Sequence, residues 1–278
     1  MTESLAALLT ALADDELVIG HRHSEWTGYA PHLEEDIAFS SIAQDEIGHA
    51  AAYYSLLGKL TGDEPDALAL GRSKDDYRHA VICERPNGDW AYTLARHWLY
   101  DTADDIRLQA LETSANDELA ALATKIRREE RYHLIHADSW IGRVAKGPVE
   151  GRTKLMDAIG VAFGDAVALF EPMEQEDAAI KEGWLPTPSD EMRRRFLDRT
   201  GVALDELGLP TQTHAHAAER AEFVASSSGD LIDTPAEEST EVATADGIGG
   251  RRGRHTSDFD SLWSDMTAQY RAHPGASW

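Results

Sequence analysis

The chain has 278 residues, of which 42% are hydrophobic, and its 26 Lys and Arg against 50 Asp and Glu give a formal net charge of −24. This length supports one large domain with a substantial core and a smaller appended part. Nucleic acid and anionic membrane surfaces would repel such a chain, and no run of about 18 apolar residues is present to cross a bilayer. We therefore expect a cytoplasmic protein that binds neither nucleic acid nor membranes.

The basic side chains are mostly arginine, because only six of the 26 are lysine. Excess carboxylates with scarce lysine suit a salt-rich cytoplasm, where high ionic strength screens the repulsion between like charges. The hypothesis of an acidic, halophile-like protein requires higher stability in molar KCl than in low salt. Equal stability in both would contradict it.

Cysteine chemistry is limited to Cys83. A single cysteine forms neither an internal disulfide nor a thiolate metal cluster, which fits a reducing cytosol. Because Cys83 ends an Ala-Val-Ile-Cys run, we expect it in the core rather than in catalysis.

The first two predicted helices form a hairpin. Apolar residues recur at helical spacing over 5–26 and again over 33–60. Gly28, Tyr29 and Pro31 interrupt the pattern and predict the turn between the two helices.

A second hairpin follows after a connector. Residues 63–88 are expected to cross the bundle with one or two short helices and to end at the turn signal 85–88, Arg-Pro-Asn-Gly. Helices are then predicted over 89–112 and 118–144. The short polar residues 114–117 between them favour a turn and an N-cap.

Helical periodicity continues over 153–170 and 190–204, so residues 1–210 are predicted to form one helical bundle. The next segment, 211–254, is acidic and has hardly any large apolar side chains, so we expect it to stay flexible or to be ordered by a partner. Periodicity returns in 255–278, which is expected to form a C-terminal helix and tail. No strand-like alternation competes with this all-α prediction.

Two Glu-x-x-His motifs occur on the predicted helices, Glu46 with His49 and Glu130 with His133. Residues three apart share a helix face, so each pair can present a carboxylate oxygen and an imidazole nitrogen to one metal ion. A single motif of this kind is more often a solvated helix face. The argument therefore depends on whether the two motifs lie at the same level.

The positions of the turns give that level. In an antiparallel hairpin, residues equidistant from the turn lie opposite each other, and the midpoint of Glu16 and Glu46 is Pro31, inside the first predicted turn. With a rise of about 1.5 Å per residue, both carboxylates lie about 22 Å from that turn. The midpoint of Asp101 and Glu130 falls inside the second predicted turn. Both pairs pass the same geometric test.

One carboxylate from each of two helices and one Glu-x-x-His from each of the other two form the ligand pattern of ferritin-like di-metal proteins. Four carboxylates and two neutral imidazoles offset the charge of two iron ions and leave coordination positions for oxygen, although ligand type does not exclude manganese. We therefore predict a ferritin-like bundle with two iron ions held by Glu16, Glu46, His49, Asp101, Glu130 and His133.

Several other side chains compete for these roles. Asp105 is the strongest rival, because it is predicted on the same face as Asp101. Asp45 and Glu129 each precede a motif and either accept the outer N–H of the other motif's histidine or are simply solvated. Tyr132 lies inside a motif, close enough to approach the metals. Asp14, Asp15, Glu25 and Asp104 fit the level less well, and no role is assigned to His21, His23, His32, His79, His97, His136, His214, His216, His255 or His273.

Four stretches of the chain resemble one family. They are residues 24–34 (SEWTGYAPHLE), 85–89 (RPNGD), 131–134 (RYHL) and the ending 273–278 (HPGASW). Together they resemble the ferritin-like C-type component of the multicomponent phenylacetyl-CoA ring epoxidase, and the resemblance is weakest over 211–250.

The resemblance implies a hetero-oligomer in which a homologous A-type component binds phenylacetyl-CoA and epoxidises its ring with O2 and iron. A reductase component would relay electrons from NADPH, and the C-type component usually acts as a structural partner. C-type components commonly carry neutral residues at several ligand positions, whereas this chain has Glu16, Glu46, His49 and Glu130. Three functions stay open: an oxygenase component with its own irons, a scaffold with a structural or vestigial metal site, and an iron-oxidising or storage protein. No catalytic residue is assigned.

Overall fold

The computed structural model describes residues 2–209, 248–273 and 276. Over these residues the secondary structure is helical, without a strand, which confirms the all-α prediction. Most of the acidic segment predicted at 211–254 lies outside the described residues. None of the described helices combines the length and the apolar character needed to cross a membrane.

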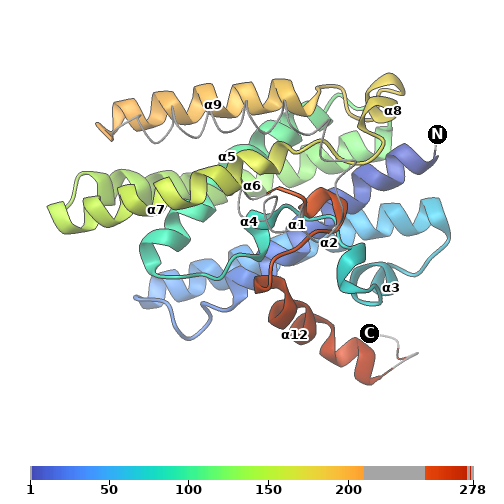
Figure 1. Cartoon of the computed structure of the whole chain (residues 1–278), viewed down its shortest axis with the longest axis horizontal. Helices are drawn as coiled ribbons and strands as arrows, with labels where there is room; N and C mark the ends of the chain where they lie inside the picture. The colour runs from blue at the N-terminus through green and yellow to red at the C-terminus, as the bar shows by residue number, and fades with distance from the viewer. Residues whose placement is uncertain (1, 210–247, 274–275, 277–278) are drawn as a thin grey trace, which may run out of the picture.

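The first hairpin pairs α1 (Thr2–Ser24) with α2 (Leu33–Thr61) (Figure 1). Pro31 lies in the turn between these two helices. The two helices approach closely at Gly20, where an added Cβ would lie 2.9 Å from the Cβ of Glu46. The missing side chain of Gly20 therefore lets α2 bring Glu46 directly against α1.

The second hairpin pairs α5 (Trp90–Leu111) with α6 (Asp117–Ala145). Each helix has a side-chain cap: Asp89 and Asn116 both accept a hydrogen bond of 2.9 Å from the backbone amide three residues later. These caps satisfy amides that have no partner within the helix, and they fix where each helix begins. The turn over 112–116 contains the predicted midpoint.

The two hairpins are joined by a connector and pack through α2 and α6. The connector contains α3 (Pro65–Leu70), a 3-10 turn η1 (Lys74–Asp76) and the short α4 (Val81–Glu84). This arrangement of four long helices with one crossover is that of a ferritin-like bundle.

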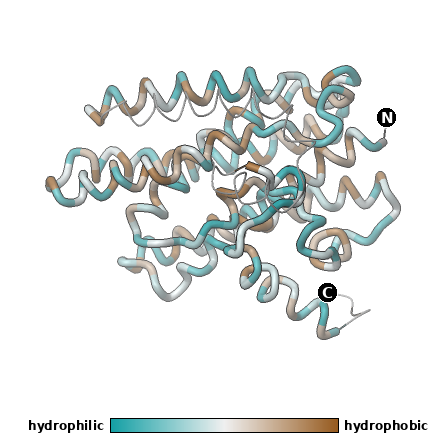
Figure 2. The backbone as a smooth tube through the Cα atoms, viewed as in Figure 1, coloured by the Kyte–Doolittle hydropathy of each residue, from teal (hydrophilic) through white to brown (hydrophobic). Residues whose placement is uncertain are grey.

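Further helices cover the second hairpin. Helix α7 (Val149–Val167) packs on α5 and α6 and continues into η2 (Ala168–Phe170). After the short α8 (Glu176–Lys181), helix α9 (Ser189–Glu206) packs on α5. Figure 2 shows hydrophobic and hydrophilic residues alternating along α7 and α9, as expected for helices with one buried face.

The C-terminal part returns to the opposite side of the molecule from α9 (Figure 1). Here η4 (Gly250–Arg252) leads into α12 (Asp258–Ala272), which packs on α3, η1 and α4. A Cβ on Gly250 would lie 2.2 Å from the carbonyl oxygen of His79, so only glycine permits this path. Residues 248–254, the described end of the segment predicted to be flexible or ordered by a partner, are therefore packed against the connector.

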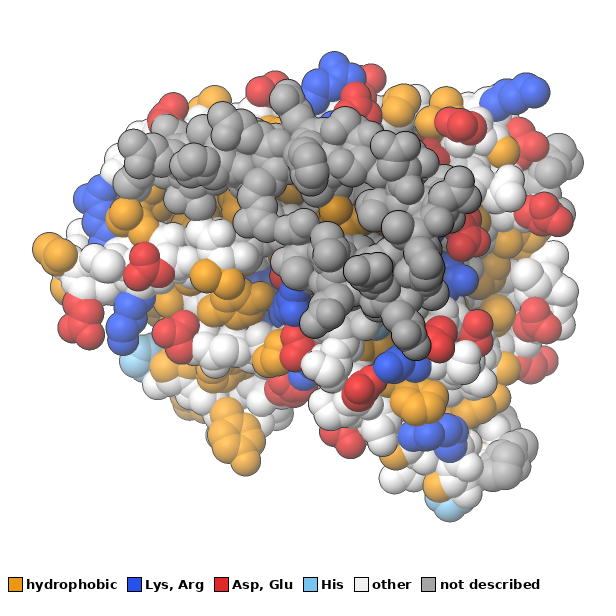
Figure 3. Space-filling view, viewed as in Figure 1, with side chains coloured by type: hydrophobic (Ala, Val, Ile, Leu, Met, Phe, Trp, Pro, Cys, Tyr) orange, Lys and Arg blue, Asp and Glu red, His pale blue; other side chains and the backbone are white. Residues whose placement is uncertain are grey.

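Buried apolar side chains from all the long helices form one continuous core. Cys83 is fully buried in it, as predicted. On the face shown in Figure 3, acidic side chains are spread among basic and hydrophobic ones rather than gathered in one patch. The described residues of that face therefore form no concentrated anionic site.

Candidate metal centre

The predicted ligands come from four helices and lie in the interior of the bundle. Each of the six residues is at most 3% exposed. Four buried carboxylates at one level are costly unless cations or protons balance their charge. The six residues are Glu16 on α1, Glu46 and His49 on α2, Asp101 on α5, and Glu130 and His133 on α6.

Glu16, Glu46, His49 and Glu130 form the tightest group, in which one ligating atom of each lies within 4.8 Å of the others. His49 Nδ1 faces three carboxylates, at 3.2 Å from Glu130 Oε1, 3.6 Å from Glu16 Oε2 and 3.9 Å from Glu46 Oε2. His133 Nδ1 lies 3.1 Å from Glu130 Oε1 and 3.8 Å from Glu46 Oε1. The two Glu-x-x-His motifs therefore meet in the bundle interior.

Asp101 stands slightly apart, beside His97, whose Nδ1 lies 3.1 Å from Asp101 Oδ2 without the alignment of a hydrogen bond. Its rival Asp105 is bound to Arg127 at 2.9 Å and to Arg199 at 2.6 Å. Asp105 follows Asp101 by one turn of α5, but its carboxylate is bound by arginines of α6 and α9 instead of joining the buried group.

Asp104, expected to fit the level less well, is buried near the group. Arg107 donates to Asp104 Oδ1 at 2.6 Å, while Asp104 Oδ2 has no hydrogen-bond partner among the described residues. Burial raises the pKa of Asp104 well above its usual range, and Arg107 offsets only part of this effect. Asp104 therefore adds to the excess of carboxyl groups at this level.

The outer nitrogen of each motif histidine contacts an acid of the other motif. His49 Nε2 lies 3.0 Å from Glu129 Oε2, and His133 Nε2 lies 3.2 Å from Asp45 Oδ2. These contacts are the ones that the sequence suggested. When the outer nitrogen donates its proton to a carboxylate, the inner nitrogen of a neutral ring presents the lone pair that a metal ion needs.

Without a metal ion, the carboxylates of the group outnumber the positive charges that could balance them. Burial raises the pKa of Glu46 well above its usual range, and the carboxylates of Glu130 and Glu16 raise it further. Burial, followed by Glu130, acts in the same way on Asp101. Burial opposes the charged form of His133, but the carboxylates of Glu130, Asp45 and Asp101 together outweigh it and raise the pKa of His133 to about 10. Without a metal ion, protons must take the place of cations here.

Unpaired polar atoms give an independent test of whether a metal fits. Buried oxygens without donors are costly, and native structures rarely leave several of them together. Oxygen-rich sites with imidazole nitrogens suit iron and manganese. Within the six predicted ligands, the atoms without a hydrogen-bond partner among the described residues are Glu16 Oε2, both oxygens of Glu46 and of Asp101, Glu130 Oε1 and His49 Nδ1. The donor set therefore fits a two-metal group.

A line of polar side chains leads from Asp101 toward the surface, and the sequence did not suggest it. His97 Nε2 lies 3.3 Å from His136 Nδ1, and His136 Nε2 lies 2.8 Å from Glu35 Oε2. The spacing of His97 and Asp101, four residues apart on α5, was the one available signal. The contact of His136 on α6 with Glu35 on α2 joins two helices, and spacing along one helix does not reveal it.

The tyrosine that lies near the predicted ligands is not the one that the sequence suggested. Tyr132 is 73% exposed, so the expectation that it approaches the metals is wrong; it points outward while its neighbour His133 points inward. Tyr100 on α5 is fully buried, and its hydroxyl donates to Glu16 Oε1 at 3.3 Å. The residue adjacent to a ligand on a helix is turned about 100° away from it, which accounts for the error.

His23 makes the stability of the fold dependent on pH. It is fully buried beside Phe39, and neither ring nitrogen has a hydrogen-bond partner among the described residues. Burial, followed by the charges of His97 and Arg96, lowers the pKa of His23 well below 6.5. The unfolded chain therefore binds a proton that the folded chain does not, and stability falls as the pH drops below about 6.5.

This one group contributes up to about 1.4 kcal/mol per pH unit. Denaturant titrations at several pH values between about 7.5 and 5.5 should show a shallower pH dependence for His23→Leu than for the native chain. His32→Leu, at an exposed histidine, should keep the native slope. An unchanged slope in His23→Leu would contradict this assignment.

The whole chain, residues 1–278, matches the family model described as phenylacetic acid catabolic protein. It is 29% identical over 275 residues to the C component of the 1,2-phenylacetyl-CoA epoxidase of Escherichia coli (strain K12), with 99% of each chain covered. The A component of the same organism's epoxidase is 28% identical over 205 residues, which cover 68% of this chain and 65% of that component. On the match over its full length, the chain belongs to the phenylacetic acid catabolic protein family.

Proposed function

We propose that this chain is the C-type component of a multicomponent phenylacetyl-CoA epoxidase, an O2-dependent monooxygenase of aerobic phenylacetate degradation. The observation that carries the proposal is the end-to-end similarity to the C component of such an enzyme, together with a shorter match to its A component. In this proposal the chain pairs with a homologous A-type oxygenase component in the cytoplasm. A reductase component supplies electrons, and the complex binds phenylacetyl-CoA.

We further propose that the chain retains its own two-iron carboxylate centre. The buried group of Glu16, Glu46, His49 and Glu130, with its unpaired oxygens, supports this part of the proposal. Two iron ions bound there would supply the reduction of O2. The protein itself would hold the ions between four helices, orient both imidazoles through the two outer acids, and keep bulk water away.

A scaffold function is the second candidate, and the extent of the similarity favours it. The match covers 99% of the Escherichia coli C component but only 65% of the A component. A scaffold would keep the buried carboxylates as a structural or vestigial site while the A-type partner performs the chemistry. An iron-oxidising protein would use the same ligands but would need no partner.

The experiment that separates these functions compares the chain with and without an A-type partner. Iron per chain and phenylacetyl-CoA consumption are measured for the native chain and for Glu46→Ala and His133→Ala. If the centre is catalytic, both variants lose iron and the complex loses turnover. Glu118→Ala, at an exposed acid on the same helix as His133, should change neither quantity.

The other outcomes point to the alternatives. A chain without iron whose variants leave turnover unaffected supports the scaffold and contradicts a catalytic centre. Iron uptake and oxidation without a partner, with no consumption of phenylacetyl-CoA in either preparation, would contradict the epoxidase proposal and support an iron-oxidising protein.

The outer acids should affect iron affinity rather than stability. Asp45 and Glu129 are partly exposed, and their side chains contact His133 and His49. Replacing them by amides, in Asp45→Asn and Glu129→Gln, should weaken iron binding by about 10- to 100-fold, because the two rings lose the groups that orient them. Competition with a coloured chelator measures this affinity. Iron binding equal to that of the native chain in the double variant would show that the two acids are only solvated.

A further inference from the structure

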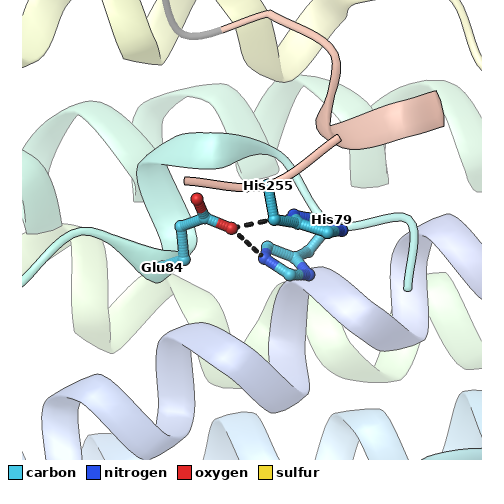
Figure 4. A group of neighbouring side chains, drawn as sticks. All are labelled: His79, Glu84 and His255. Carbon is cyan, nitrogen blue, oxygen red and sulfur yellow. Dashed lines mark hydrogen bonds and ion pairs between the residues drawn. The ribbon is translucent and has the colours of Figure 1, made fainter. Parts of the chain in front are cut away.

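A second group of metal-ligand side chains lies outside the di-metal group. His79 and Glu84 belong to the connector, whereas His255 belongs to the C-terminal segment, and all three side chains are fully buried. Figure 4 shows both imidazole rings approaching the carboxylate of Glu84 from the same side. The function proposed above uses none of these residues.

The two imidazole rings contact one carboxylate oxygen of Glu84, and Thr256 contacts the other. His79 Nε2 lies 2.7 Å and His255 Nδ1 lies 2.8 Å from Glu84 Oε2. The other oxygen, Oε1, accepts hydrogen bonds from the amide of Thr256 at 2.6 Å and from its hydroxyl at 2.7 Å. The rings themselves are stacked, with centroids 4.1 Å apart and 15° between their planes. Two imidazole nitrogens therefore lie within 2.8 Å of one carboxylate oxygen, and the three ligating atoms are close enough together to hold one ion.

The outer side of the group is arranged as in metal sites. His255 Nε2 lies 3.1 Å from the carbonyl oxygen of Tyr77, which can accept the proton of this outer nitrogen when Nδ1 binds a cation. Thr256 similarly fixes Glu84 so that it can bind through one oxygen. The close approach of Gly250 to the carbonyl of His79 sets the distance between the two backbone segments.

We propose that His79, Glu84 and His255 bind one divalent transition-metal ion, with zinc as the best match to two imidazoles and a carboxylate, and that this ion fastens the C-terminal segment to the connector. A tetrahedral ion with bonds of about 2.0 Å holds neighbouring ligand atoms about 3.3 Å apart. Binding therefore moves the two ring nitrogens away from Oε2 by about half an ångström and tilts the stacked rings so that both face the ion. The protons that the two nitrogens share with Oε2 pass to the outer nitrogens or to solvent as metal bonds replace the two hydrogen bonds. The site shares no residue with the di-metal centre and does not depend on the proposed function.

The test uses the full chain with Glu46→Ala and His133→Ala, so that the di-metal group does not compete for the probe. After treatment with a chelator, the protein is titrated with Co2+, followed by its visible d–d absorption, and with Zn2+, followed by metal analysis. One ion per chain is expected, with a rise in Tm on binding. Adding His255→Gln or Glu84→Gln should lower the affinity at least tenfold, whereas His273→Gln, at an exposed histidine of the same segment, should leave it unchanged.

Circular dichroism first establishes that each variant is folded. If the added substitutions prevent folding, X-ray absorption of Zn2+ bound to the otherwise native chain replaces them and should show two imidazole ligands. A folded chain that takes up neither Co2+ nor Zn2+ overturns the proposal, since hydrogen bonds alone would then hold the three side chains. Uptake that persists in both folded variants overturns it as well.

Discussion

Glu46→Gln is expected to stabilise the metal-free chain and, at the same time, to abolish tight iron binding. Burial and the carboxylates of Glu130 and Glu16 raise the pKa of Glu46 well above its usual range, so the folded chain must take up a proton that the unfolded chain has lost. The cost of that proton grows as the pH rises above about 4.3, the ordinary pKa of glutamate. An amide of the same shape avoids this cost.

We expect a gain of about 1–3 kcal/mol at neutral pH in the metal-free protein, which should disappear near pH 4. Denaturant unfolding in the presence of a chelator measures the gain, and iron analysis measures the loss of ligation. Glu34→Gln makes the same change at an exposed position of the same helix and should alter neither quantity. A metal-free Glu46→Gln chain less stable than the native one would show that the carboxylate is satisfied by the protein itself.

Much of the bundle could be predicted because helices and turns are determined by residues that are close together in the sequence. Apolar spacing locates α1, α2, α5 and α6 to within a few residues, and the turn residues locate both hairpins. Once the turns are known, the constant rise of a helix brings Glu16 level with Glu46 and Asp101 level with Glu130. The agreement is closest for Glu16, Glu46, His49 and Glu130, whose ligating atoms lie within 4.8 Å of one another.

The features that escaped prediction depend on which helix faces which. Level along the bundle does not tell inward from outward, so Asp105 could not be separated from Asp101 without knowing where Arg199 of α9 lies. The contact of His136 with Glu35 likewise requires α6 to lie beside α2. In both cases tertiary packing, rather than periodicity, decides the partner.

The C-terminal segment shows the same limit more strongly. A composition with hardly any large apolar side chains predicted a flexible or partner-ordered segment up to residue 254, and within its described part Gly250 and Arg251 are buried. Glycine there permits a close approach to the connector, and the arginine finds a carboxylate on α1, 236 residues earlier in the chain. Composition reports how much apolar surface a segment can bury, but not whether a charged side chain has a buried partner.

Arg251→Met should therefore be among the most destabilising single substitutions in the chain. Arg251 donates to Asp15 Oδ1 at 2.9 Å and to Asp15 Oδ2 at 2.7 Å. It also donates to the backbone carbonyls of Ala11, Arg78 and Leu169, so that one guanidinium joins α1, the connector and η2. Burial alone would raise the pKa of Asp15, but Arg251, followed by Arg107, outweighs it and lowers the pKa.

Methionine fills a similar volume but leaves three carbonyls without that donor and Asp15 with one arginine fewer. Removing one partner of a buried ion pair typically costs about 3–5 kcal/mol, which for a chain of this size lowers Tm by about 6–20 °C. Arg252→Met provides the matched control, because the neighbouring Arg252 is exposed and bonds only weakly to the carbonyl of Pro172 at 3.4 Å. Calorimetry of both variants measures the two Tm values. Equally small decreases in Tm would mean that the C-terminal segment contributes little to the stability of the fold. A large decrease in Arg251→Met alone would show that the C-terminal segment helps to hold α1 in position.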